Sequence, residues 1–173
     1  LTNKLLQLAG GAVYDENGKA QIVHDQKLEV LNQLIEEANG QPVLVFYNYK
    51  HELDRLQARY PQAVHVKEEN VVKRWNAKEI PILLANPASA GHGLNLQFGG
   101  HIAIWYSPTW NLEFFQQANK RLHRRGQAET VLIHTLSAKG TIDERIYDIV
   151  LRNKEAGQNA LLEAVKARIK EVT

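Results

Sequence analysis

The chain has 173 residues, which suits one domain with a real hydrophobic core and room for a helical appendage. Its formal net charge is +2 at pH 7, which is nearly neutral. The net charge therefore does not indicate a nucleic-acid partner, and any basic surface must be local. The chain contains no cysteine, and no apolar run approaches the roughly 18–20 residues of a membrane span, so disulfide scaffolds and membrane-spanning proteins are excluded and no membrane partner is expected.

The first 25 residues are predicted to form a lead-in segment. Gly10-Gly11 breaks this stretch, and Asp15–Gly18 is typical of a turn. Apolar residues then recur at helical spacing from Gln26 to Ala38 and predict an amphipathic helix, which Asn39-Gly40 ends.

Continuous apolar runs bounded by turn signals predict strands that are covered on both faces. These runs are Pro42–Tyr47, Ile80–Ala85, His101–Tyr106 and Thr130–Thr135, with a shorter strand at Ala63–Val66. Helices are predicted at Lys50–Tyr60, Val71–Asn76, Asn111–Arg121 and from Ile142 to about Lys154, and Leu161, Val165 and Ile169 indicate a last helix.

Strand and helix therefore alternate through the body of the chain. This alternation predicts an α/β fold, doubly wound, with a mainly parallel sheet, helices on both faces and additional C-terminal helices. In such folds ligands bind beyond the carboxyl ends of the strands. The unusual residues lie in the corresponding loops, which are Asn48-Tyr49, Asn86–Gln97 and Ser107–Asn111.

A basic segment from Gln116 to Gln127 carries the strongest chemical signal. If the predicted helix continued through it, Gln117, Arg121 and Arg124 would share one face. Two guanidinium groups on one face suit a phosphate on which charge develops, because each offers a planar fork of donors. The alternative is a solvated basic helix end that favours the helix dipole.

Two loops carry weaker signals. Asn86–Leu96 contains Gly91 and Gly93, which permit close approach of the backbone to a phosphate, but it matches neither phosphate-binding glycine motif. In Ser107–Asn111, the asparagine is a candidate helix cap, and Trp110 is either a core residue or a surface aromatic residue.

Together these segments resemble, in order and spacing, the C-terminal RecA-like lobe of Swi/Snf-family superfamily 2 ATPases, which are DNA translocases. Val43–Tyr49 is similar to helicase motif IV and Ser89–Leu96 to motif V. Pro108–Asn111 resembles the tryptophan–asparagine element, and Gln117–Gln127 resembles motif VI. The likeness runs from about Lys27 to about Lys154.

The resemblance implies roles for individual residues. Arg121 and Arg124 would reach the γ-phosphate of ATP held by the other lobe, with Arg124 favoured as the arginine finger. Gln117 would help to order them, and Gly93 and Asn95 would line the nucleotide side of the cleft. The residues implied to face the DNA backbone are Asn48, Ser89, Ala90, Gly91, Trp110 and Asn111.

The sequence departs from the family pattern in three places. Arg125 stands where a small apolar residue is usual, and His92 stands where glycine is frequent. The span from Tyr60 to Ile80 is short. These features favour a compact motor of bacterial or phage type, acting in the cytoplasm, over a nuclear chromatin remodeller.

The implied domain plan is a lead-in segment (1–25), the helicase C-terminal lobe (26–141) and a helical extension (142–173). The implied partners are the N-terminal lobe of the same parent chain and duplex DNA. ATP and Mg²⁺ would be held mainly by that N-terminal lobe, so we expect no ATP hydrolysis by this chain alone, and no metal site in it, since its histidines lack ligand spacing.

Three alternatives stay open at this point. The chain could be a non-catalytic nucleic-acid-binding module with the same fold. It could also be the lobe of an RNA helicase, which is a closely related class. An unrelated doubly wound enzyme or interaction domain would instead hold a small cofactor at the switch point of the sheet.

Overall fold

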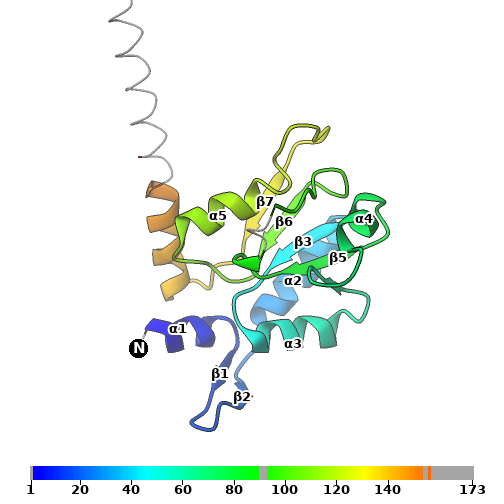
Figure 1. Ribbon diagram of the computed structural model, residues 1–173. Coiled ribbons are helices and arrows are strands. Elements are labelled where there is room, and N and C mark those ends of the chain that lie inside the picture. Colours follow the sequence, from blue (N-terminus) through cyan, green and yellow to red (C-terminus); the bar gives the residue numbers. More distant parts are fainter. Residues whose placement is uncertain (1, 90–92, 154–155, 157–173) are drawn as a thin grey trace, which may run out of the picture.

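The computed structural model describes residues 2–89, 93–153 and 156. Its centre is a five-stranded sheet in the order β4-β5-β3-β6-β7, in which every pairing is parallel (Figure 1). The strands are β3 (Val43–Phe46), β4 (Val64–His65), β5 (Ile82–Ala85), β6 (Ile102–Trp105) and β7 (Leu132–Thr135). Each lies within the run that predicted it, which confirms the parallel α/β sheet.

Both faces of the central strands of this sheet are covered by helices, as the continuous apolar runs predicted, whereas the edge strand β7 is mostly exposed. On one face α2 (Gln26–Glu37) and α3 (Lys50–Arg59) pack against β3 residues such as Val43 and Val45. On the other face Leu44 and Phe46 pack with α4 (Val71–Asn76), α5 (Leu112–Asn119) and the helix over residues 142–153. Every residue of β3, β5 and β6 is therefore buried, and the doubly wound arrangement is confirmed.

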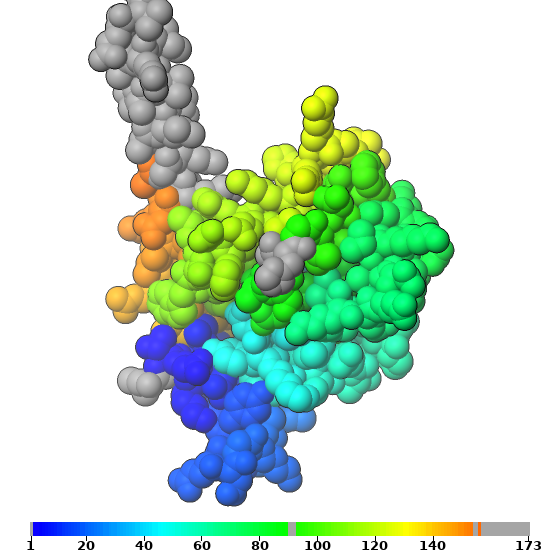
Figure 2. All heavy atoms as spheres, in the orientation of Figure 1, coloured from blue at the N-terminus to red at the C-terminus, as the bar shows by residue number. Residues whose placement is uncertain are grey.

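The N-terminal segment contains a helix and a hairpin that the sequence did not reveal. α1 (Thr2–Ala9) is followed by β1 (Ala12–Tyr14) and β2 (Ala20–Ile22), which pair antiparallel. The predicted turn joins them, with Asp15 Oδ1 accepting hydrogen bonds from Asn17 N and Lys19 N. α1 (dark blue in Figure 2) lies against the segment that follows β3 (cyan).

α5 is shorter than predicted, because it ends at Asn119 and turns and bends occupy residues 120–126. Asn119 is buried, and its Oδ1 accepts a hydrogen bond of 2.9 Å from Trp105 Nε1. Arg121 and Arg124 therefore do not lie on the helix, so the prediction that they share one helical face with Gln117 was wrong.

The helix over residues 142–153 agrees with the predicted helix from Ile142. The last predicted helix, at Leu161, Val165 and Ile169, lies outside the described residues. Within the part of the chain that the structure describes, none of the helices has the length and apolarity needed to cross a bilayer.

Candidate functional site

The predicted site residues form two groups at opposite ends of α5. Asn111 caps the N-terminal end, next to the loops that follow β3 and β6, and Arg121 and Arg124 follow the C-terminal end. Eight residues of α-helix span about 12 Å, so the two groups are separate but joined by one short rigid element. The loops expected at the carboxyl ends of the strands supply the first group, and the basic segment supplies the arginines of the second.

Asn95 and Arg124 meet at the C-terminal end of α5. Arg124 Nη1 donates a hydrogen bond of 2.5 Å to Asn95 Oδ1, and both side chains are exposed. The segment from Gly93 onward runs back from β5 toward the start of β6, which brings Asn95 to this end. Gly93 itself is exposed, with φ +67° and open space where a Cβ would stand.

A surface depression of about 400 Å³ lies beside this pair. It is lined by Gln117, Lys120, Arg121, His123 and Arg124. Burial lowers the pKa of the Arg121 guanidinium, and the charge of Arg124 lowers it further. An arginine keeps its charge in proteins, so two adjacent guanidinium groups are best stabilised by an anion near them.

The side-chain amide of Gln117 is bonded within α5. Its Nε2 donates to Glu113 Oε1 over 2.7 Å, within the helix. The turn after α5 is instead held by Gln127, whose Nε2 donates to Gly100 O at 3.0 Å and Leu122 O at 3.3 Å.

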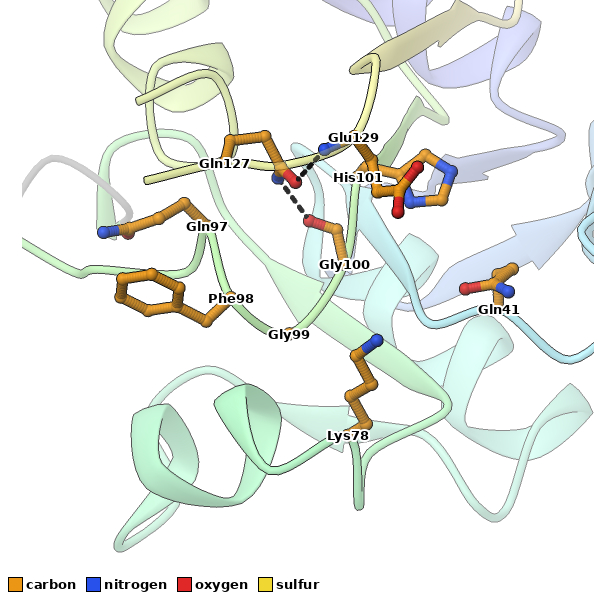
Figure 3. Close-up of a pocket in the computed structure, with 9 residues that line it drawn as sticks. All are labelled: Gln41, Lys78, Gln97, Phe98, Gly99, Gly100, His101, Gln127 and Glu129. Carbon is orange, nitrogen blue, oxygen red and sulfur yellow. Dashed lines mark hydrogen bonds between the residues drawn. The ribbon is translucent and has the colours of Figure 1, made fainter. Parts of the chain in front are cut away.

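These Gln127 contacts border a small pocket of about 170 Å³ at the amino ends of the strands (Figure 3). Phe98 lines the same pocket, and its ring lies 3.1 Å from the position that a Cβ on Gly126 would take. The pocket lies at the edge of the sheet opposite to the loops that follow β3 and β6.

Asn48, Trp110 and Asn111 gather at the N-terminal end of α5. Asn48 Nδ2 donates to Pro108 O at 2.5 Å, and Asn111 Oδ1 accepts from Phe114 N at 3.0 Å, so the predicted helix cap is present. Trp110 is 46% exposed, and the core interpretation of this residue was wrong.

A second surface depression, of about 460 Å³, opens beside these residues. It is lined by Thr2, Asn3, Leu6, Asn48, Tyr49, Pro108, Thr109, Trp110, Asn111 and Phe114. Ser89 is half-buried after β5, and Ala90 and Gly91 lie outside the described residues.

A buried carboxylate behind this depression escaped the sequence reasoning. Glu52 is fully buried, and its Oε1 accepts a hydrogen bond of 2.5 Å from Ser107 Oγ. Its Oε2 accepts from Asn48 N at 2.8 Å and Tyr49 N at 3.1 Å, so one side chain fixes the loops after β3 and β6. Burial raises the pKa of Glu52, against the opposing effect of these hydrogen bonds. The only local signal was an acidic residue three positions after Tyr49, the residue that precedes α3.

The two ends of α5 offer different chemistry. The C-terminal end presents cationic groups that can stabilise negative charge, and the N-terminal end presents amides and aromatic rings. Among residues 2–89, 93–153 and 156, no group of three or more His, Asp or Glu side chains is placed to hold a metal ion.

Comparison with known proteins places these features in a family. Residues 26–126 match the helicase conserved C-terminal domain. The chain is 42% identical over 175 residues to the putative protein p41 of Acyrthosiphon pisum secondary endosymbiont phage 1, covering 96% of this chain and 38% of that protein. It is 31% identical to the chromatin-remodeling ATPase INO80 of Mycosarcoma maydis, covering 87% of this chain and 9% of that protein.

A solved structure has a similar fold. It is the C-terminal part of the Fun30 ATPase domain, with a TM-score of 0.64 at 24% identity, covering 75% of this chain and 45% of that one. The chain thus spans less than two-fifths of the length of the curated relatives described above.

Proposed function

The chain belongs to the helicase conserved C-terminal domain family and is the C-terminal, RecA-like lobe of a Swi/Snf-family helicase, and from this we propose that it is the second motor lobe of an ATP-dependent DNA translocase. In this proposal Arg124 and Arg121 supply positive charge to the γ-phosphate of ATP bound by the N-terminal lobe. Asn48, Ser89, Trp110 and Asn111 face the DNA backbone, with Ala90 and Gly91 as predicted neighbours.

The geometry of α5 carries the proposal. Arg124, held by Asn95, and Arg121 follow one end of this helix, and Asn111 caps the other. Because a short packed helix moves as a unit, a shift imposed by phosphate at one end is transmitted to the DNA-facing loops at the other. This is what a motor needs if it changes its grip on DNA during each ATP cycle.

The cationic end of α5 suits the phosphate of ATP, not its metal. Arginine forks bind phosphate oxygens, whereas Mg²⁺ requires oxygen ligands such as carboxylates together with substrate phosphates. We therefore assign Mg²⁺ and most of the ATP contacts to the N-terminal lobe, with Arg124, Arg121 and Gly93 approaching from this side. We also propose that the parent is bacterial or phage-encoded and acts in the cytoplasm; one relative is a phage protein.

The test is ATP turnover by the intact protein, with and without duplex DNA, in Arg124→Ala and Arg124→Lys variants. We expect DNA-stimulated turnover to fall by roughly 10³-fold in Arg124→Ala while ATP binding persists. Arg124→Lys should not restore turnover, because lysine lacks the planar fork. Arg59→Ala is the matched control, since Arg59 is exposed at the end of α3 on the opposite face of the sheet.

Unchanged turnover in Arg124→Ala would show that Arg124 is not the arginine finger. If the arginine variants weakened DNA binding and left turnover intact, the chain would be a nucleic-acid-binding module with the same fold. Stimulation by RNA in place of DNA would make it an RNA helicase lobe. The 173-residue chain assayed alone is expected to show no turnover, because it lacks the lobe that holds the nucleotide.

A further inference from the structure

The depression at the N-terminal end of α5 has an unusual lining for a surface that faces DNA. Three aromatic side chains contribute to it, from the loops after β3 and β6 and from α5: Tyr49, Trp110 and Phe114. Tyr49 and Phe114 are half-buried and Trp110 is 46% exposed, so the rings are held in place yet open to solvent. None of the lining residues is charged. The amides and hydroxyls of this lining can contact phosphate or sugar, but three aromatic rings are not needed for that, so the rings indicate a flat ligand such as a base.

Three asparagines supply polar groups at the same place. Asn48 Nδ2 is bonded to Pro108 O, Asn3 Oδ1 accepts from Tyr49 Oη at 2.6 Å, and Asn111 Oδ1 accepts from Phe114 N. Each amide is therefore oriented by one bond. In the residues that the structure describes, the opposite atom of each amide, Asn48 Oδ1, Asn3 Nδ2 and Asn111 Nδ2, has no protein partner. One amide oxygen acceptor and two amide NH₂ donors thus remain, a set that can complement the edge of a nucleobase.

We infer that this depression binds one unpaired nucleobase, stacked against the aromatic rings and hydrogen-bonded by the asparagine amides. The volume of about 460 Å³ lies in the range of small-molecule sites, and aromatic rings with oriented amides are the usual means of holding a base outside its stack. The inference rests on the proposed DNA-facing role of Asn48, Trp110 and Asn111, and it names the ligand of that surface.

α1 adds a wall to this pocket that lies outside the family match. Thr2, Asn3 and Leu6 form one wall, and Asn3 is tied to the opposite wall through Tyr49. The helicase family match begins only at residue 26, so the match does not include this wall. The aromatic rings alone would form an open surface, and α1 closes it on one side.

The test uses the 173-residue chain and three DNA probes of otherwise identical sequence. One duplex is fully paired, one carries a single unpaired 2-aminopurine, and one carries an abasic site at that unpaired position. We expect the unpaired base to raise affinity about tenfold or more over the other two probes, because stacking of one base is worth roughly 5- to 150-fold in binding. The 2-aminopurine fluorescence should be quenched on binding as the base stacks on protein rings.

Two variants locate the effect. Phe114→Leu removes a ring while keeping an apolar side chain, and Asn3→Ala removes the exposed amide on α1. Each variant should reduce the preference for the unpaired base about fivefold or more. Neither should change the affinity for the paired duplex appreciably. Phe98→Leu is the matched control, because Phe98 is 55% exposed and lines the pocket at the amino ends of the strands. It should retain the full preference.

Three results would overturn the inference, and each has a different meaning. Equal affinity for all three probes would show that the chain binds DNA without taking a base, which contradicts the base pocket and leaves the DNA-facing surface intact. Absence of binding to any probe would contradict both. Equal preference for the unpaired base and the abasic site would mean that DNA flexibility, not base capture, is recognised.

Discussion

Glu52 shows how one side chain can hold two loops that are far apart in the sequence. Its carboxylate accepts hydrogen bonds from Asn48 N, Tyr49 N and Ser107 Oγ in a site closed to solvent. Burial of a charge is unfavourable, and it is tolerated here because the donors and the nearby charge of Lys27 compensate. The bonds keep the backbone after β3 and the backbone after β6 in a fixed relation.

Replacement of Glu52 should therefore destabilise the chain in a graded way. Glu52→Ala leaves three buried donors without an acceptor, and we expect the free energy of unfolding to fall by about 2–5 kcal/mol. Glu52→Gln keeps one acceptor for the two backbone N–H groups, and its amide can donate to the serine hydroxyl, so it should lose less than the alanine variant. Urea unfolding of both variants measures this, and equal losses would contradict the proposed hydrogen-bond role.

At this scale the sequence predicted local contacts and missed distant ones. The cap by Asn111 depends on a residue three positions away, and it was predictable. The bond from Arg124 to Asn95 joins residues 29 positions apart, and that from Ser107 to Glu52 joins residues 55 apart. Nothing in the local pattern specifies such pairs; the family resemblance alone suggested that Asn95 and Arg124 lie on the same side of the cleft.

At the scale of elements, burial decides which features are predictable. β3, β5 and β6 were clear from sequence because both of their faces are covered, so every residue in them is apolar. α1 and the hairpin after it are short and depend on tertiary contacts, such as the bond from Tyr14 N to Gln7 Oε1, and their sequence shows no long periodicity. The predicted helix extended beyond the observed end of α5, because Arg121 and Leu122 suit a helix. In the structure α5 ends at Asn119, whose side chain is buried against Trp105.

The turn that follows α5 depends on a glycine. Gly126 has φ +97°, and a Cβ there would lie 3.1 Å from the ring of Phe98. Gly126→Ala should lower the free energy of unfolding by about 1–3 kcal/mol, through strain in the left-handed region and through this close contact.

Thermal or urea unfolding of Gly126→Ala alone and together with Phe98→Ala separates the two causes. Removing the ring relieves the contact but not the backbone strain, so the double variant should regain only part of the stability that Gly126→Ala loses. Full recovery would show that φ is not the constraint, and no loss in Gly126→Ala would show that the turn tolerates another conformation.

At the scale of the whole molecule, alternation of strands and helices predicted a parallel doubly wound sheet, but not the order of its strands. The chain places β3 in the centre and adds strands first on one side and then on the other. This switch places the carboxyl ends of β3 and β6 side by side, which assembles Asn48 and Ser107 at one edge. Local propensities say nothing about strand order, so this part of the site needed either the structure or the family resemblance.

The ion pair between Lys27 and Asp143 joins the start of the lobe to its C-terminal helix. Lys27 lies in α2 and Asp143 in the helix over residues 142–153, and their charged atoms are 2.5 Å apart with both side chains buried. Lys27 Nζ also lies 5.9 Å from the centre of the Tyr106 ring, and Asp143 Oδ2 accepts from Ala138 N. The pair is thus a point where the two ends of the described fold depend on each other.

We expect this pair to be strongly coupled, because removal of either partner leaves a buried charge that has lost its ion-pair partner. Asp143→Leu and Lys27→Met should each lower the free energy of unfolding by about 3–5 kcal/mol. The double variant Lys27→Met/Asp143→Leu should lose much less than the sum, since apolar residues of similar size replace a buried ion pair at little cost. A double-mutant cycle in urea measures the coupling. If the single effects simply add, the two charges act independently and the C-terminal helix is held to the lobe by its apolar face alone, through Ile146 and Val150.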